Sequence, residues 1–168
     1  MKRFPLMLIC CLLIGNTVLA QSPKLGYINS QELLAAMPET GKADTVLQKY
    51  AKQFEDEYTT MQKEYQTKGQ QYQAGEKTMT DAIREVKTKE IQDLQARIES
   101  FQQSAQEKVT QKKQEVLAPI YDKANKAIKD VAKEKGYDYV FDASQGVLLY
   151  GKDGDNILPL VKQKLGLK

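Results

Sequence analysis

Between Ala43 and Ala118 the sequence carries two long, highly polar stretches whose few apolar residues recur at helical spacing. Steps of three and four place these residues on one face of each helix. The two apolar faces comprise Leu47, Tyr50, Phe54, Tyr58, Met61, Tyr65 and Tyr72, and then Ile83, Val86, Ile91, Leu94, Ile98, Phe101, Ala105, Val109 and Val116. Because the break at residues 75–78 is short, the pattern predicts an antiparallel helical hairpin. Such a hairpin is too narrow to enclose an active site, so we expect its shape to carry the function.

The first twenty residues have the pattern of a cleaved export signal. A basic start at residues 2–3 precedes an apolar run and a small-residue cleavage signature at residues 18–20. The apolar run is shorter than the roughly 20 residues of a membrane-spanning helix, which disfavours a retained anchor. The two cysteines inside the run lack the small preceding residue expected beside a lipidated cysteine. We therefore expect export, with a mature chain that begins at Gln21.

The composition of that mature chain argues against an enzyme. Both cysteines would leave with the signal, and the sequence contains no histidine. The commonest nucleophile–base pairs and transition-metal ligands are then missing. The stretch Asp153-Gly154-Asp155-Asn156 lacks the sixth-position glycine and closing glutamate of a calcium loop, and it predicts a turn with a helix cap. We expect no catalytic residue, no metal and no cofactor.

The charge balance gives no basis for nucleic-acid binding. Removal of Lys2 and Arg3 lowers the number of basic residues from 25 to 23, against 22 acidic residues. Nucleic-acid binding normally requires a clustered basic face, whereas these charges alternate in sign and are mixed with glutamines. This pattern is typical of a solvated helix surface.

Helix-start and helix-stop residues set the expected limits of the hairpin. Thr40 or Asp44 begins the first long helix, which ends near Gln73 before Gly75. Thr78 with Asp81 resembles a capping box for the return helix, which continues to about Lys135 and is capped by Gly136. Gly69 weakens the last turns of the outgoing helix by about 1 kcal/mol relative to alanine, so the tip is expected to be soft.

Two prolines mark the level at which the hairpin leaves the rest of the chain. Pro38 and Pro119 lie at similar distances from the tip, one on each helix. In an antiparallel hairpin they therefore sit at nearly the same height, and a proline inside a helix removes a hydrogen bond and kinks it. We interpret this level as the junction with a compact base.

The base is predicted to be a small mixture of strands and short helices. Strands are expected at residues 24–29, 137–142 and 147–150, from their β-branched and aromatic content. Ser30 is predicted to cap a short helix that Pro38 ends, and Asp155 or Asn156 to cap a final helix. The fold class is therefore α+β. So few residues form a marginal domain, and its exposed strand edges favour oligomerisation.

The layout resembles the Skp family of periplasmic chaperones, also called OmpH-like proteins, over essentially the whole mature chain. The resemblance rests on residues 24–34, on Gly136-Tyr137-Asp138-Tyr139-Val140-Phe141-Asp142-Ala143 and on residues 157–165. The strand that ends in Val-x-Asp-Ala before a second apolar strand is its most specific part. On this basis we divide the chain into a signal peptide (1–20), a first part of the body (21–42), a hairpin tentacle (43–118) and a second part of the body (119–168).

The family resemblance implies a homotrimer in which a small β-barrel, assembled from all three chains, carries three hairpins around a central cavity. Unfolded outer-membrane proteins would be held in that cavity in the periplasm without ATP. The expected trimer contacts are Leu25, Tyr27, Tyr139, Val140, Phe141, Val147 and Leu149. The competing hypothesis is a structural one, a coiled-coil scaffold or adaptor of the cell envelope.

Candidate client contacts lie toward the tip of the hairpin. They are Tyr58, Met61, Tyr65, Tyr72, Met79 and Ile83. The simpler interpretation is that the tyrosine rings pack in the seam, with Tyr65 and Tyr72 near Ile83 and Leu94; the alternative is that rings near the tip turn into the cavity. The lysines at 63, 68, 77, 87 and 89, with Arg84, favour a solvated face. Their alternative role is electrostatic steering of clients or transient contact with an anionic membrane surface.

Overall fold

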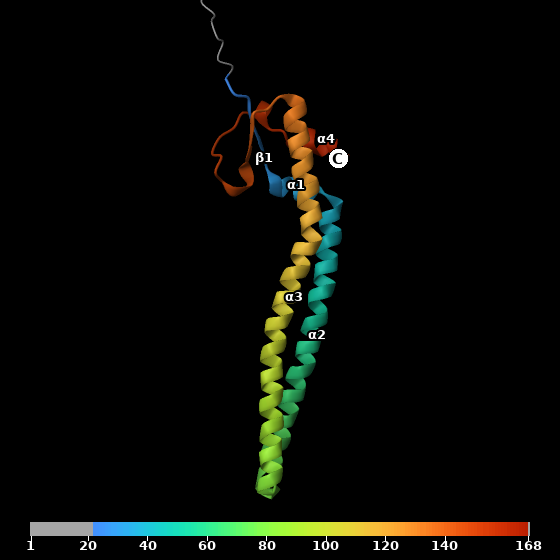
Figure 1. Cartoon of the computed structure of the whole chain (residues 1–168), viewed down its shortest axis with the longest axis vertical. Helices are drawn as coiled ribbons and strands as arrows, with labels where there is room; N and C mark the ends of the chain where they lie inside the picture. Colours follow the sequence, from blue (N-terminus) through green and yellow to red (C-terminus); the bar gives the residue numbers. More distant parts are fainter. Residues whose placement is uncertain (1–21, 168) are drawn as a thin grey trace, which may run out of the picture.

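The computed structural model describes residues 22–167, and its longest feature is the predicted helical hairpin (Figure 1). Helix α2 (Pro38–Gly75) runs outward, a 3₁₀ turn (Glu76–Thr78) closes the tip, and helix α3 (Asp81–Lys135) returns. The prediction that α2 begins at Thr40 or Asp44 is wrong, because Pro38 is already its first residue. Proline is tolerated there since its missing N–H would have no partner within the helix. The predicted export signal lies outside the described residues.

The return helix is capped by a different threonine from the one predicted. Thr80 is the N-cap, and its Oγ1 accepts a hydrogen bond from Ile83 N at 3.4 Å. Thr78 is not the cap, because its hydroxyl donates to Gly75 O at 2.9 Å and so closes the end of α2. At the other end Gly136 caps α3 as predicted, with a φ of 69° that the missing Cβ permits.

Four short elements gather at the base of the hairpin (Figure 1). Strands β1 (Leu25–Ile28) and β2 (Tyr139–Asp142) pair in parallel, with Leu25 opposite Tyr139. Helix α1 (Ser30–Ala36) follows β1, and helix α4 (Leu158–Lys164) closes the described chain. The predicted Ser30 cap is wrong by one residue: Asn29 Oδ1 accepts from Glu32 N at 3.0 Å, while the Ser30 hydroxyl donates to Asp142.

All these elements share one hydrophobic core. Leu33 of α1, Ile157 and Val161 are fully buried, and the C-terminal third of α3 contributes Ile120 and Val131. Within the same region Glu39 of α2 and Lys123 of α3 form an ion pair. The segments that follow Pro38 and Pro119 therefore lie side by side, as the proline spacing predicts.

The prediction of a third strand at residues 147–150 is wrong for this chain. Val147, Leu149 and Tyr150 are irregular and 81%, 94% and 80% exposed. Strand β1 already pairs with β2 on one side and forms a bridge from Tyr27 to Asn156 on the other. β-forming residues become a strand only when a partner strand is present, and within this chain the segment 147–150 pairs with neither β1 nor β2, so it stays irregular.

Candidate functional site

The arm, defined here as the part of the hairpin beyond the base core, is held by a thin apolar seam. Only Met61, Leu94 and Ile98 are buried there, with Tyr58, Tyr65 and Phe101 packed around them. No residue is buried at positions 44–60, 62–93 or 99–119. The arm therefore has one short closed segment, and elsewhere its helices meet through partly exposed side chains.

The tyrosines predicted as seam residues lie on the seam, and all are partly buried. Tyr65 packs beside Leu94, and its hydroxyl approaches Gln95 Oε1 at 3.5 Å. Tyr72 lies nearer the tip in a shallow depression that it shares with Arg84 and Thr88. Met61 is 7% exposed, so in the single chain it serves the seam.

Near the tip, the apolar stripe predicted from Ile83 and Val86 does not face α2. Ile83 is 49% and Val86 56% exposed. The seam side of α3 is occupied there by Arg84 and Thr88, one and two residues further along, each partly buried. Since each helical residue turns by roughly 100°, a shift of one residue moves Ile83 off the seam. Apolar side chains thus remain uncovered at the tip.

Met79, another predicted client contact, folds back over the end of α2. Its Cε lies 2.7 Å from where a Cβ on Gly75 would stand. A Cβ at Gly75 would require the end of the flexible Met79 side chain to shift, whereas the backbone of Gly75 is not left-handed, because its φ is −97°. The Met79 side chain is partly exposed at the tip.

Three of the six cations near the tip, Lys68, Arg84 and Lys87, are paired with carboxylates. Lys68 of α2 reaches Glu90 of α3 at 3.3 Å, and Lys87 reaches the same carboxylate at 3.2 Å. Hydrogen bonds from Lys87 and then Lys68 lower the pKa of Glu90. Arg84 lies 3.5 Å from Asp81. This pairing favours the solvated-face interpretation for these three cations.

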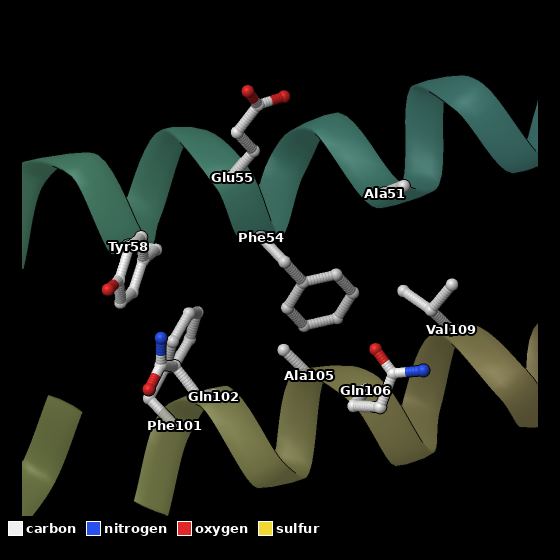
Figure 2. Close-up of a pocket in the computed structure, with 9 residues that line it drawn as sticks. All are labelled: Ala51, Phe54, Glu55, Tyr58, Phe101, Gln102, Ala105, Gln106 and Val109. Atoms are coloured by element: carbon white, nitrogen blue, oxygen red, sulfur yellow. The ribbon is translucent and has the colours of Figure 1, made fainter. Parts of the chain in front are cut away.

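Midway along the arm the two helices leave an open apolar groove, which the residue pattern did not single out as a site (Figure 2). We call it the mid-arm slot; it has a volume of about 360 Å³ and is formed mainly by Ala51, Phe54, Tyr58, Phe101, Ala105 and Val109. Phe54 points from α2 toward Ala105 and Val109. Its ring meets Tyr50 edge-on at 5.1 Å and Phe101 at 6.0 Å. The sequence signal that could have indicated this groove is the pair Ala51 and Ala105, whose side chains are too small to fill the space between the helices.

The base carries an exposed apolar sheet face. Leu25, Tyr139 and Phe141 are 46%, 60% and 50% exposed. Alternation along each strand and the parallel register place them with Tyr27 on one face, while Ile28 is buried and Val140 packs against the core on the other. The Tyr27 ring lies against Gly151, so the open segment 147–150 ends beside this face. Five of the seven predicted trimer residues are therefore exposed, whereas Tyr27 and Val140 are partly buried.

Two aspartates that could suggest catalysis have structural partners. Asp138 Oδ2 accepts from Lys24 N at 2.6 Å, and Asp142 accepts from the Ser30 hydroxyl at 2.6 Å and from Ser144 N at 2.9 Å. Burial raises the pKa of Asp142, but the hydrogen bonds from Ser30 and Ser144 outweigh it and hold that pKa below its usual value. Both carboxylates therefore act as links between chain segments.

Residues 22–167 show neither a membrane-spanning helix nor a metal-binding cluster. No helix among them is both long and apolar enough to cross a bilayer. In the same residues, no three side chains of the usual metal-binding types come together.

Comparison with known proteins gives three agreeing matches. Residues 24–165 match the model of a family described as outer membrane protein (OmpH-like). Over 142 residues the chain is 29% identical to the protein named Chaperone protein Skp from Vibrio cholerae serotype O1. The aligned region covers 80% of this chain and 78% of that protein. A crystal structure of an OmpH-like outer membrane chaperone from Caulobacter crescentus CB15 has the same fold, with a TM-score of 0.73 at 17% identity over 86% of this chain and 84% of that one.

Proposed function

This chain belongs to the family of OmpH-like outer membrane proteins, and we propose that it is an ATP-independent holdase chaperone of the periplasm. Its clients would be unfolded outer-membrane proteins, held in a cavity between the arms of three identical chains. The observation that carries the proposal is the family match along nearly all of the described chain, together with a relative named as a chaperone. Relatives of this kind are chaperones, which also argues against an enzyme.

The base supports the homotrimer. A two-stranded sheet with one face open leaves Leu25, Tyr139 and Phe141 half exposed, and the adjoining Val147 and Leu149 almost wholly so. Contiguous apolar surface of this kind marks an interaction site. A second and third copy would cover it, and each could offer its own segment 147–150 as a partner for an exposed edge.

The arm supports diffuse client binding. Its partly exposed rings at Tyr58, Tyr65 and Tyr72, with Met79 and Ile83 at the tip, are separated by polar residues. We keep these five side chains as candidate contacts, whereas Met61 would act through the seam. Several weak contacts in one enclosure give useful avidity without a specific pocket. Such contacts suit clients whose sequences differ.

The test is a mass measurement of the full mature chain with and without an unfolded outer-membrane barrel protein, paired with light scattering to follow client aggregation. We expect a trimer that forms a one-to-one complex and delays aggregation. A monomer that leaves aggregation unchanged would overturn the proposal. A trimer that binds only a folded envelope protein in fixed stoichiometry would also overturn it and would favour the scaffold.

A matched pair of variants tests the assembly surface. Phe141→Asp places a charge on the exposed sheet face, whereas Tyr121→Asp does so at a ring of similar exposure on α3 (50% and 46%). We expect only Phe141→Asp to yield monomers that no longer protect the client. Equal behaviour of both variants would remove the sheet face from the trimer contact.

A further inference from the structure

We propose that the mid-arm slot is a binding site for an aromatic side chain flanked by lysine or arginine in an extended client segment. This inference rests on the proposed function, because the occupant of the slot would be part of an unfolded client polypeptide. It goes further by assigning one location and one chemical class to a contact that would otherwise be diffuse.

The space in the slot suits an aromatic ring. An apolar cavity of about 150 Å³ accommodates a benzene molecule, and the slot measures about 360 Å³. The opening arises because Ala51 and Ala105 stand where the next level of the arm has larger residues. There Met61, Leu94 and Ile98 close the seam and are 3–7% exposed. The slot is thus a local gap in packing between two helices that meet again beyond it.

The walls of the slot offer aromatic surfaces in usable orientations. Phe54 meets Tyr50 at an interplanar angle of 77° and Phe101 at 47°, so the rings are not stacked face to face on one another. An incoming ring can complete an edge-to-face or offset pair with them. A neighbouring guanidinium or ammonium group can lie over a ring face within about 6 Å.

The charge around the slot selects the flanking residues. Positions 51–58 and 101–109 carry four carboxylates, Glu55, Asp56, Glu57 and Glu107, against Lys52 and Lys108. Lys52 is already paired with Asp56 at 3.0 Å. Near the tip, by contrast, the Glu90 carboxylate has two lysine partners. Of these carboxylates, Glu55 is the one that lines the slot, and a carboxylate at the edge of an apolar opening complements a basic and aromatic segment.

The absence of tryptophan from this protein makes a direct measurement simple. An unstructured peptide with one tryptophan between two arginines would be titrated with the full mature chain and followed by tryptophan emission and anisotropy. We expect a blue shift and saturable binding. A matched peptide with glutamates beside the tryptophan should bind about tenfold more weakly, which corresponds to about 1.4 kcal/mol.

Ala105→Leu is the decisive variant, because it fills the slot and removes none of its aromatic walls. Its control is Ala96→Leu, an exposed position on the same helix. We expect Ala105→Leu to weaken the arginine-flanked peptide about tenfold or more and Ala96→Leu to leave it unchanged. Since Ala105→Leu could disturb the arm, Glu55→Gln with Glu57→Gln provides a second test, in which the preference for arginine over glutamate should shrink.

The outcomes separate the slot from the general function. A wild-type chain that ignores the peptide, or an Ala105→Leu chain that binds it like wild type, overturns the slot. If Ala105→Leu alters only self-association, a second copy occupies the slot and the proposal is again overturned. Protection of a whole unfolded barrel protein is measured in parallel: if the wild type protects it while the peptide tests fail, only the slot is lost. If protection itself fails, the proposed function is lost as well.

Discussion

The base and the arm are built from the same two long helices, yet they bury their side chains in different ways. In the base, α3 shares a core with β1, α1, α2 and α4, and Leu33, Ile157 and Val161 have no exposed surface. In the arm, α3 has only α2 beside it, and three residues are buried. The difference teaches that burial depends on how many elements converge on a helix and not only on how apolar its face is.

The two regions also leave different kinds of apolar surface uncovered. The base concentrates Leu25, Tyr139 and Phe141 on one sheet face, next to an exposed apolar segment. The arm spreads single rings and aliphatic groups along both helices, and the mid-arm slot lies among them. A concentrated face suits a permanent partner of fixed shape, whereas dispersed contacts suit a partner that has no fixed shape. The proposed trimer and the proposed client contacts follow this division.

The largest effect is expected from a cavity in the base core. Leu33→Ala should lower the free energy of unfolding by about 2–5 kcal/mol, because the side chain is fully buried among several elements that cannot all collapse around the gap. Urea unfolding followed by circular dichroism, at one fixed protein concentration, measures it. A loss no greater than that of an exposed alanine substitution would contradict the described core.

The equivalent change in the arm sharpens the comparison. Ile98→Ala removes a residue that is 5% exposed in the seam, where only two helices meet. We expect a smaller loss, near the lower end of the same range at about 2 kcal/mol, because the two helices can approach each other. Hydrogen exchange should change along the arm and leave β2 protected. Loss of protection at β2 would show that arm and base unfold as one unit.

Much of the fold followed from local pattern. The hairpin, the end of α3 at Gly136 and the strands near residues 25 and 140 were predicted because helical spacing, a capping glycine and β-branched content act over short distances. The helix caps were predicted at the wrong residue where two nearby side chains were both suitable N-caps. Asn29 and not Ser30 caps α1, because the Ser30 hydroxyl donates a hydrogen bond to Asp142, which lies 112 residues further along the chain.

Features that depend on a distant partner could not be predicted from local pattern. Residues 147–150 have the composition of a strand but no strand beside them in one chain. Near the tip, packing against α2 decides which face of α3 lies in the seam, and this leaves Ile83 exposed outside the seam. The slot requires that Ala51 and Ala105 line the same stretch of the seam from opposite helices, which depends on the register between the two helices.

Glycine substitutions give a moderate effect of opposite sign in the two regions. Gly69 lies inside α2, and a Cβ added there would meet nothing within 4 Å. Gly69→Ala should therefore stabilise the outer arm by about 1 kcal/mol. Gly136→Ala at the base end of α3 should destabilise by about 1–2 kcal/mol, because its φ of 69° is left-handed. Hydrogen exchange at residues 65–75 measures the change caused by Gly69→Ala, and the urea midpoint measures the change caused by Gly136→Ala. Stabilisation by both variants, or destabilisation by both, would contradict this contrast between the two regions.

The smallest effect is a dependence on acid that begins in the base. Because hydrogen bonds hold the folded pKa of Asp142 below its usual value, its contribution to stability is complete above the unfolded pKa of about 3.9 and is lost as the pH falls through the folded pKa. Asp142→Asn should lower the urea midpoint at pH 7 and flatten its decline between about pH 4 and pH 2.

Glu90→Gln in the arm is the matched change, since paired lysines lower the pKa of Glu90 as well. The Asp142 carboxylate joins segments 112 residues apart, whereas Glu90 joins two solvent-exposed helices whose ion pairs are screened by salt. We therefore expect the acid sensitivity removed by Asp142→Asn to persist in high salt, and that removed by Glu90→Gln to disappear there; the reverse result would contradict this contrast between base and arm.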